Sequence, residues 1–503
     1  MQKRKTFLLI LVPLFVICLA FLANTWRNGG ALPARAQEAD GENGQPVTLY
    51  VPLLMNVYTD PPEFADNLFG IEVTPADYLQ EIPEVAQAGS AFTRLNVVRW
   101  ADIEPQQGVR DWSVLAGFEQ QLQFAAQNDL QVIVIVRHTP DWAQKTPGAY
   151  CGPIKADKLA TFGDFLYELV SRYQGAPYFV KYWELYNEPD VAPNLVQPDS
   201  PYGCWGDAAD PYYGGGYFAE MLKVAYPKIK QADPEAQVIT GGVLLSCNPA
   251  SGKCVSDEEI TASKFFEGIL ANQGGDYFDV AGFHNYDFYL FELGTYFSRK
   301  WDSYWDTTGP AVIAKANFLK DLMEAYGVSG KSLMNTETAL LCGPADVPPE
   351  IPGCEGAPNA PFELTKAHYI AQTYAAAIAE GLSANIWYNL SGWRNSGLVY
   401  ADLSPRPAYT AYQFAREKLE EAVYLGPIES QDTGGETNVQ GYKYQRPDGG
   451  QVWIIWSLNR TPQTISLTTS PDSAWNVFGS TVALDALQTL TIPMEPRYIE
   501  WNP

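Results

Sequence analysis

A repeating alternation of short apolar runs and amphipathic stretches constrains the fold of this chain more than any other feature. The alternation begins at Leu68, and between the runs apolar residues recur at every third or fourth position, which is helical spacing. Repeated strand–helix units predict a parallel sheet, and eight of them close naturally into a barrel. We therefore predict an α/β fold, a (β/α)8 TIM barrel, over residues 68–423. The predicted strands are Phe69–Val73, Phe92–Val98, Gln131–Val136, Val180–Tyr186, Ala236–Thr240, Val280–His284, Ser332–Thr336 and Ala384–Asn389.

The pattern changes after Tyr424. Apolar residues then alternate with polar ones in the period of a strand, between turns rich in Gly and Pro, and helical spacing is absent from the sequence. This pattern predicts a small β-sandwich over residues 424–503, which we interpret as a structural appendage rather than a sugar-binding module. Its predicted strands are Gly441–Gln445, Val452–Leu458, Thr464–Thr468, Ala474–Val482 and Leu487–Ile492.

The N-terminal segment has the features of an export signal. Three basic residues at positions 3–5 precede an apolar run from Phe7 to Ala23, and Ala34-Arg35-Ala36 offers a small-residue cleavage site. Residues 1–36 are therefore either a signal peptide or an uncleaved membrane anchor, since the run is long for the first and short for the second. Both alternatives predict an exported protein, extracellular or at the cell surface, with a linker over residues 37–67.

The charge of the chain limits its partners. It has 33 basic and 58 acidic residues, a net charge of -25 at pH 7. Such a surface repels phosphate backbones, which argues against nucleic acid as a partner. It also disfavours strongly anionic polysaccharides, unless a local basic patch compensates. Membrane contact is expected only through the N-terminal segment. The sequence lacks the spacing of a metal site or a phosphate-binding glycine loop, so no cofactor or metal is predicted.

Two glutamates stand where a barrel carries its catalytic groups. Glu188 follows the fourth predicted strand, and Glu337 follows the seventh. Strands four and seven face each other across the carboxyl-terminal mouth of a barrel. Glycoside hydrolysis needs such a pair, one group to protonate the leaving oxygen and one to attack the sugar or activate water. Asn187 could bond a sugar hydroxyl and Pro189 fixes the turn, whereas Glu184 is interpreted as structural.

Further polar and aromatic residues at strand ends are candidates for substrate binding. His284 and Tyr286 are two residues apart, so they point to the same side of a strand. A Tyr286 hydroxyl near Glu337 would hold that carboxylate in place, and Arg94 or Arg99 on the second strand would favour its ionised form. Tryptophan faces at a barrel mouth bind sugar rings. The predicted binding residues are Asn187, His138, His284, Tyr286, Trp387, Arg94, Trp142 and Trp393.

These residues resemble the clan A glycoside hydrolases, which are retaining barrels with an acid/base glutamate on strand four and a nucleophile on strand seven. The resemblance covers roughly residues 68–423, and the most specific element is Asn187-Glu188-Pro189. Arg94, His138 and Trp387 are similar to the strand-two arginine, strand-three histidine and strand-eight tryptophan of family 5.

Two other segments are more similar to family 39. They are Trp100–Pro105, with Gly108 and Trp112 beyond it, and Thr139–Ala143. A C-terminal β-sandwich also suits family 39. The resemblance implies a glycosidase that needs no cofactor, and it leaves the exact family and the substrate open.

The combined prediction is a retaining glycoside hydrolase that cleaves β-linked neutral glycans or glycosides. Glu188 is the expected general acid/base and Glu337 the expected nucleophile. The alternatives are a transglycosylase with the same residues and a non-catalytic glycan-binding barrel, which the presence of both glutamates disfavours. A retaining mechanism predicts carboxyl groups about 5–5.5 Å apart, against about 6.5–9.5 Å for an inverting one. The charge of Glu337 is expected to raise the pKa of Glu188.

The cysteines predict disulfide bonds. Of seven cysteines, Cys18 lies in the N-terminal apolar run, and the other six follow predicted strands three, four, five and seven. An even number in an exported chain suggests three disulfides, although six cysteines allow 15 connectivities. Pairing within short loops is simplest. The predicted bonds are Cys247–Cys254, Cys342–Cys354 and Cys151–Cys204.

Overall fold

The computed structural model confirms the predicted fold class. It describes residues 62, 67–191, 205–254, 256–289, 296–297, 305, 309–342, 354, 360–459, 461–484 and 488–503. The predicted export segment and nearly all of the predicted linker lie outside these residues. Within the described part of the chain, no helix is both long enough and apolar enough to cross a membrane.

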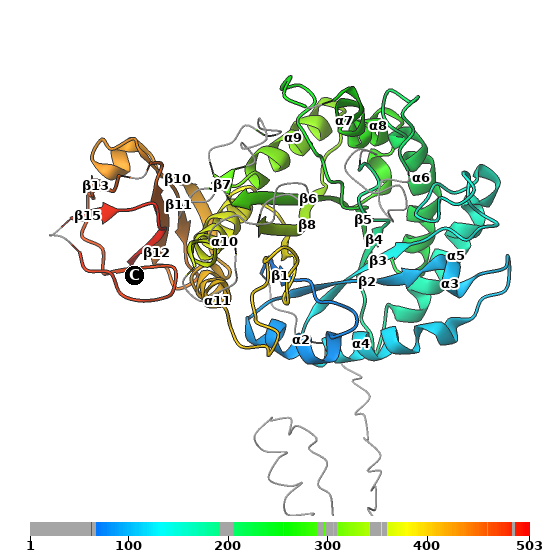
Figure 1. Ribbon diagram of the computed structural model, residues 1–503, viewed down its shortest axis with the longest axis horizontal. Helices are drawn as coiled ribbons and strands as arrows, with labels where there is room; N and C mark the ends of the chain where they lie inside the picture. Colours follow the sequence, from blue (N-terminus) through cyan, green and yellow to red (C-terminus); the bar gives the residue numbers. More distant parts are fainter. Residues whose placement is uncertain are drawn as a thin grey trace, which may run out of the picture. The chain divides into compact units, whose positions relative to one another are not determined.

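Eight parallel strands of the described chain close into a barrel with helices on its outside (Figure 1). The order is β5-β4-β3-β2-β1-β9-β8-β6, and pairing of β5 with β6 completes the ring. The short strand β7 (Tyr296–Phe297), which was not predicted, pairs antiparallel with the end of β6. The barrel strands are β1 (Phe69–Ile71), β2 (Phe92–Arg99), β3 (Gln131–Arg137), β4 (Tyr182–Leu185), β5 (Gln237–Thr240), β6 (Val280–Tyr289), β8 (Ser332–Leu341) and β9 (Ala384–Trp387).

The helices bury the apolar stripe that the sequence predicts. In α5, for example, Phe162, Phe165, Leu166 and Leu169 are buried at spacings of three and four residues. Among the described residues, the connections after β2 and β5 each carry two α-helices. The helices are α2 (Tyr78–Gln87), α3 (Trp100–Ile103), α4 (Ala116–Ala126), α5 (Leu159–Tyr173), α6 (Gly215–Ala232), α7 (Asp257–Ala262), α8 (Phe265–Ala271), α9 (Val312–Ala325), α10 (Pro361–Ala379) and α11 (Pro407–Leu419).

The barrel interior is layered. Inward side chains near the amino ends of the strands form an apolar cluster that includes Phe92, with Tyr182 packed against it. Successive side chains of a strand alternate between its faces, so the position two residues further on also faces inward. Those positions hold Arg94 and Glu184, both fully buried. A buried polar layer therefore lies directly on the apolar layer, towards the carboxyl ends of the strands.

The C-terminal residues form the predicted β-structure. A five-stranded antiparallel sheet has the order β10-β11-β12-β16-β14, and β13 pairs with β15. One sheet face packs on the barrel helices, where Tyr444 donates to the carbonyl of Ala375 at 2.7 Å. The opposite face packs against β13 and β15. Strands β10 and β16 were not predicted. The strands are β10 (Val423–Pro427), β11 (Val439–Gln445), β12 (Gln451–Ser457), β13 (Gln463–Ser466), β14 (Ser473–Trp475), β15 (Thr489–Ile492) and β16 (Arg497–Trp501).

Candidate active site

Arg94 on β2 lies at the centre of the buried polar layer. Its Nε donates to Glu184 Oε2 at 2.7 Å, and its Nη2 donates to Asn187 Oδ1 at 2.6 Å. Its Nη1 donates to Glu72 Oε2 at 2.8 Å and also to Glu337. A guanidinium carries five donors in a fixed plane, so one side chain can hold groups from several strands at once. Arg94 thereby fixes the relative positions of three carboxylates.

Glu337 points into the barrel because β8 contains a β-bulge. His284 of β6 lies opposite Glu337, whereas the residue before His284 lies opposite Asn335, so Thr336 is the extra residue. Thr336 also faces inward, since its Oγ1 donates to Glu184 Oε1 at 3.1 Å. Strict alternation would turn Glu337 outward when Thr336 faces in. The bulge brings both side chains into the polar layer.

Tyr286 on β6 completes the surroundings of Glu337. Its hydroxyl donates to Glu337 Oε2, as the sequence predicted. Burial raises the pKa of Tyr286 well above its ordinary value, so the hydroxyl keeps its proton and remains a donor. Glu337 thus receives hydrogen bonds on both carboxylate oxygens, one from Tyr286 and one from Arg94.

The turn after β4 presents Glu188. Tyr186 and Glu188 have φ values of 65° and 44°, in the left-handed region that is costly for residues other than glycine. Such backbone persists where its surroundings over-determine it, and it clusters at functional sites. Here Asp190 fixes the turn, because its carboxylate accepts the backbone N–H groups of Leu244 and Leu245 at 2.8 and 2.9 Å.

The environment of Glu188 favours its protonated form. Burial raises the pKa of Glu188 to about 7, against the opposing charges of Arg94 and Lys315. We predicted from the sequence that the charge of Glu337 would raise this pKa. In the structure burial is the main cause of the rise, and the charge of Glu184 adds to it. Below pH 7 this carboxyl group is therefore mostly protonated and can serve as an acid.

His284 connects the two glutamates. Its Nδ1 lies 2.8 Å from Glu188 Oε1 and 3.5 Å from Glu337 Oε2. Burial lowers the pKa of His284 to about 4, so the ring is neutral at pH 7. Its Nε2 lies 3.5 Å from Nη2 of Arg94, which is always a donor, so we assign the proton to Nδ1. A Cβ at Gly242 would collide with Nε2, so glycine is required beside the ring.

Glu188, His284 and Glu337 each offer a ligand atom, and these atoms lie within 4.8 Å of one another. Three such atoms could hold a cation. However, the guanidinium of Arg94 already compensates the charge of Glu337, and a metal ion here would lie beside that fixed positive charge. The arrangement is better suited to proton transfer and to attack on a carbon centre.

The aromatic residues near β9 take different positions from those predicted. Trp387 is fully buried, and its indole N–H donates to the carbonyl of Ser396 at 3.0 Å. A ring with no exposed face offers no platform to a sugar. Trp393 is 46% exposed and packs edge-to-face against Tyr286 and Tyr388, with ring centroids 6.0 and 6.3 Å apart. Trp393, which contacts the ring of Tyr286, therefore has a face that a ligand could reach.

The remaining predicted residues lie at the ends of β2 and β3. His138 follows β3, and its ring packs against Tyr150 at 4.9 Å. Burial lowers the pKa of His138 to about 3, so it is neutral. Trp142 donates to the carbonyl of Glu104 at 3.0 Å and belongs to the packing around α3. Arg99 is about half exposed and lies 3.8 Å from Asp102, so Arg94 is the arginine beside Glu337.

Sequence reasoning missed three residues of the site. Glu72 follows β1, and burial raises its pKa, against the opposing charge of Arg94. The only signal in the sequence was an acidic residue near the end of the first predicted strand, Phe69–Val73. Asp190 and the buried Lys315 of α9 both bond the backbone of the loop after β5. No sequence motif indicates either residue. Glu184, interpreted as structural, is a direct partner of Arg94.

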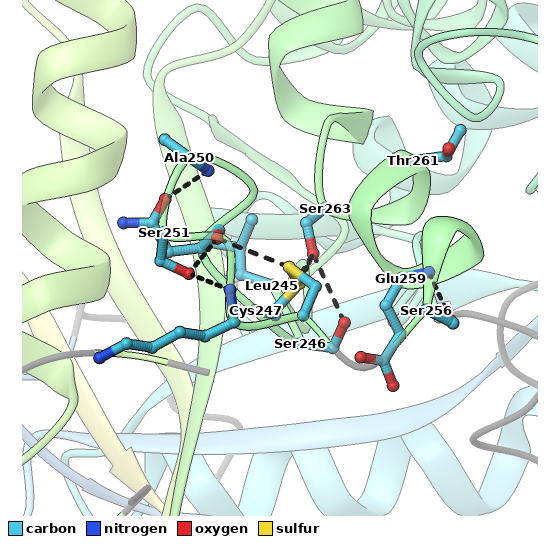
Figure 2. The surroundings of a disulfide bond; sticks show 12 residues. Leu245, Ser246, Cys247, Ala250, Ser251, Ser256, Glu259, Thr261 and Ser263 are labelled. Atoms are coloured by element: carbon cyan, nitrogen blue, oxygen red, sulfur yellow. Dashed lines mark hydrogen bonds between the residues drawn. A yellow bond between two sulfur atoms is a disulfide. The ribbon is translucent and has the colours of Figure 1, made fainter. Parts of the chain in front are cut away.

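Two of the predicted disulfides are present. Cys247–Cys254 and Cys342–Cys354 have Cα atoms 5.5 and 5.8 Å apart. Figure 2 shows the first of them in the loop after β5, where Ser263 accepts the backbone N–H of Cys247 at 3.3 Å. Cys151 is also disulfide-bonded. Its predicted partner, Cys204, lies outside the described residues.

A (β/α)8 barrel with glutamates after its fourth strand and on its seventh is the arrangement of the clan A glycoside hydrolases. The sequence model of the cellulase family (glycosyl hydrolase family 5) matches residues 59–333, and the chain belongs to this family. Among curated proteins, none matches the sequence.

Solved structures share the fold at low sequence identity. A family 39 glycoside hydrolase from Bacteroides cellulosilyticus WH2 has a TM-score of 0.63 and 19% identity, covering 87% of this chain and 81% of that one. A family 30 endoxylanase from Clostridium papyrosolvens C71 gives 0.55 and 13%, covering 89% and 99%. A monomeric β-xylosidase from Caulobacter crescentus CB15 gives 0.52 and 14%, covering 88% and 98%. At these identities the likeness concerns the fold alone.

Proposed function

We propose that this glycoside hydrolase acts with retention of configuration on β-linked neutral glycans or glycosides. The observation that carries the proposal is the closeness of its two glutamates, each of which offers a carboxylate oxygen within 4.8 Å of the other's. Carboxyl groups about 5–5.5 Å apart leave no room for a water between the nucleophile and the sugar, whereas inverting enzymes need about 6.5–9.5 Å. The geometry therefore favours direct attack by a carboxylate.

The first step forms a glycosyl-enzyme. Glu188 donates its proton to the glycosidic oxygen while a carboxylate oxygen of Glu337 attacks the anomeric carbon. The bond between that carbon and the glycosidic oxygen breaks, and the leaving group departs as an alcohol. Arg94 and Tyr286 orient the attacking carboxylate, and the neutral His284 holds Glu188 through Nδ1.

The second step releases the sugar. Glu188, now ionised, removes a proton from a water molecule, and the water oxygen attacks the anomeric carbon. The bond to Glu337 breaks and its carboxylate is regenerated. Glu188 regains its proton, which its burial favours. If a sugar hydroxyl replaces the water, the same steps give transglycosylation.

The substrate is proposed from charge and from the relatives. The net charge of -25 disfavours anionic polysaccharides, and cellulose and xylan are β-linked chains whose backbones carry no charge. The family takes its name from cellulase, and two structural relatives are named as an endoxylanase and a β-xylosidase. The exposed Trp393, whose ring packs against Tyr286, offers a face for a neutral pyranose ring.

Export is part of the proposal. Disulfide bonds persist in oxidising compartments, and Cys247–Cys254 and Cys342–Cys354 are both formed. We infer that residues 1–36 direct export and that residues 37–67 link them to a catalytic barrel (68–423) and its β-sandwich appendage (424–503). Mass analysis of the mature secreted protein would distinguish cleavage after Ala36 from an uncleaved anchor.

Kinetics of the two glutamate variants test the roles. Glu337→Ala removes the nucleophile and should abolish turnover of every substrate. Glu188→Ala should lower kcat/KM about 10²–10⁴-fold on substrates with poor leaving groups, because general acid catalysis typically contributes that much. An activated aryl glycoside leaves without a proton, so its first step should largely survive, and added azide should speed the second.

Glu104→Gln is a matched control for the loss of a buried glutamate. Glu104 is fully buried and accepts hydrogen bonds from Trp100, Gly108 and Arg110 at 2.8–2.9 Å, in the loop after β2. Its variant should lose stability without any dependence on the leaving group. Equal losses on both substrate types for Glu188→Ala would refute the assignment. A screen over cellulose, xylan and aryl β-glycosides would identify the sugar.

A further inference from the structure

A buried lysine lies beneath the acid/base glutamate, outside the groups that the mechanism uses. Lys315, in the first turn of α9, is 5% exposed. Its Nζ donates to the carbonyl oxygens of Leu244 at 2.7 Å and of His284 at 2.8 Å. A buried ammonium is expensive, and the first turn of a helix disfavours positive charge. The interactions of Lys315 must therefore compensate for its burial and for its position in the first turn of the helix.

The contacts of Lys315 close a ring around Glu188. One arm runs through the backbone of β6 to the ring of His284, whose Nδ1 lies 2.8 Å from Glu188 Oε1. The other arm runs through Leu244, whose carbonyl binds Lys315 and whose N–H binds Asp190, two residues beyond Glu188. The ammonium thus joins the strand that holds the head of Glu188 to the loop that holds its backbone.

The loop in the second arm is rigidly held. The carbonyl of Leu245 accepts the indole N–H of Trp305 at 2.9 Å, and Leu245 has a left-handed φ of 48°. Two residues further on, Cys247 forms its disulfide and contacts Ser263 (Figure 2). These contacts hold the loop independently of Lys315. If Lys315 is displaced, we therefore expect His284 and Glu188 to move and the loop to keep its position.

The charges around the ring agree with this role. Lys315 is faced by Asp287 of β6, by Asp190 and by Glu188, and these carboxyl groups oppose the lowering of its pKa to about 8 by burial. Glu188 is faced by His284 and Lys315 and, within the same polar layer, by further groups. Those groups are Arg94 on β2, Glu184 on β4 and Glu337 on β8.

We propose that Lys315 is a positioning residue for the general acid/base: it locks β6 to the loop after β5 and thereby holds His284 against Glu188. The inference rests on the proposed role of Glu188. Lys315 touches no substrate, and it acts through two backbone carbonyls and through its charge. Removing it should displace His284 and take away one of the two cations, Lys315 and Arg94, that lower the pKa of Glu188, and both changes disfavour the ionised form of Glu188.

The test compares Lys315→Met with Lys315→Arg on a poor and an activated leaving group, with pH profiles of kcat/KM. Lys315→Met should lose about 10-fold or more on the poor leaving group and much less on the activated one, since misplacement by about 1 Å can cost up to 10²-fold. Its alkaline limb should move up by about one pH unit. Lys315→Arg, which keeps charge and donors, should recover most of both.

Lys320→Met is the matched control, since Lys320 lies on the same helix, is 37% exposed and pairs with Glu380. It should leave the rates and the pH profile unchanged. If Lys315→Met does not fold, Lys315→Gln keeps an N–H donor group without the charge. An unshifted limb, equal losses on both substrates, or failure of both variants to fold would overturn the inference. Glu188→Ala on the same substrates separates the role of Lys315 from that of Glu188. If Glu188→Ala lowers the rates on both leaving groups equally, the proposed function is refuted rather than the positioning role of Lys315.

Discussion

Replacing Arg94 by lysine should be among the most damaging conservative substitutions in this chain. The guanidinium donates to Glu184, Glu72, Glu337 and Asn187 from three different nitrogens. A lysine keeps the charge, but its ammonium is a single point on a flexible stem and cannot span groups that surround a planar fork. The substituted ammonium would reach one side of the layer and leave the other without a donor.

The cost follows from the contacts that are lost. At least two charge-assisted hydrogen bonds disappear, and each is worth roughly 1.5–3 kcal/mol. Breaking a buried ion pair costs roughly 3–5 kcal/mol by a separate measure. We therefore expect Arg94→Lys to lower the free energy of unfolding by about 3–5 kcal/mol. Glu337 loses its fixed orientation as well, so kcat/KM should fall about 10²-fold.

Equilibrium denaturation in guanidinium chloride and kcat/KM on an activated aryl glycoside measure the two effects. Arg99→Lys is the control, because Arg99 is about half exposed and its only close acidic neighbour among the described residues is Asp102 at 3.8 Å. That variant should stay within about 0.5 kcal/mol of the parent. An Arg94→Lys variant as stable as the control, with unchanged kcat/KM, would refute the view that Arg94 organises the layer.

Two further predictions concern pH and substrate binding. Because Glu188 must hold a proton and its pKa is raised to about 7, kcat/KM on a poor leaving group should fall tenfold per pH unit above about pH 7; a profile flat from pH 6 to 9 would contradict this. Trp393→Ala should raise KM about 2- to 10-fold with little change in kcat, the equivalent of ~0.5–1.5 kcal/mol of stacking, while Trp393→Phe should keep most of the affinity; a variant with unchanged KM would exclude the platform.

The barrel and its pair of glutamates could be predicted because their signals are local. Strand and helix periodicities lie within single segments, and the order of the strands follows from the barrel itself. Once the fourth and seventh strands are numbered, Glu188 and Glu337 fall at the mouth without any knowledge of side-chain contacts. The hydrogen bond from Tyr286 followed in the same way, from its spacing on β6.

The residues that sequence reasoning missed depend on register and on contacts distant in sequence. The β-bulge at Thr336, which turns Glu337 inward, leaves no mark in the sequence. In the sequence Lys315 is one polar position on an amphipathic helix. Its role becomes visible only from its contacts with the carbonyls of Leu244 and His284, which are distant in sequence. The prediction that Trp387 stacks on a sugar has a similar problem, because the exposure of its ring depends on a loop that follows it in the chain. The carbonyl of Ser396 in that loop accepts the indole N–H, and the ring is buried.

Burial connects these observations. The inward positions directly above the apolar layer must be filled, and filling them with ionisable groups removes those groups from water. That one cause raises the pKa of Glu188 and lowers the pKa of His284, so the first holds a proton and the second stays neutral at pH 7. The acid proposed for this site is therefore a product of its packing more than of its charges. We therefore expect the contact between Asp190 and the backbone of Leu244 and Leu245, which fixes the turn of Glu188, to support the raised pKa of the proposed acid.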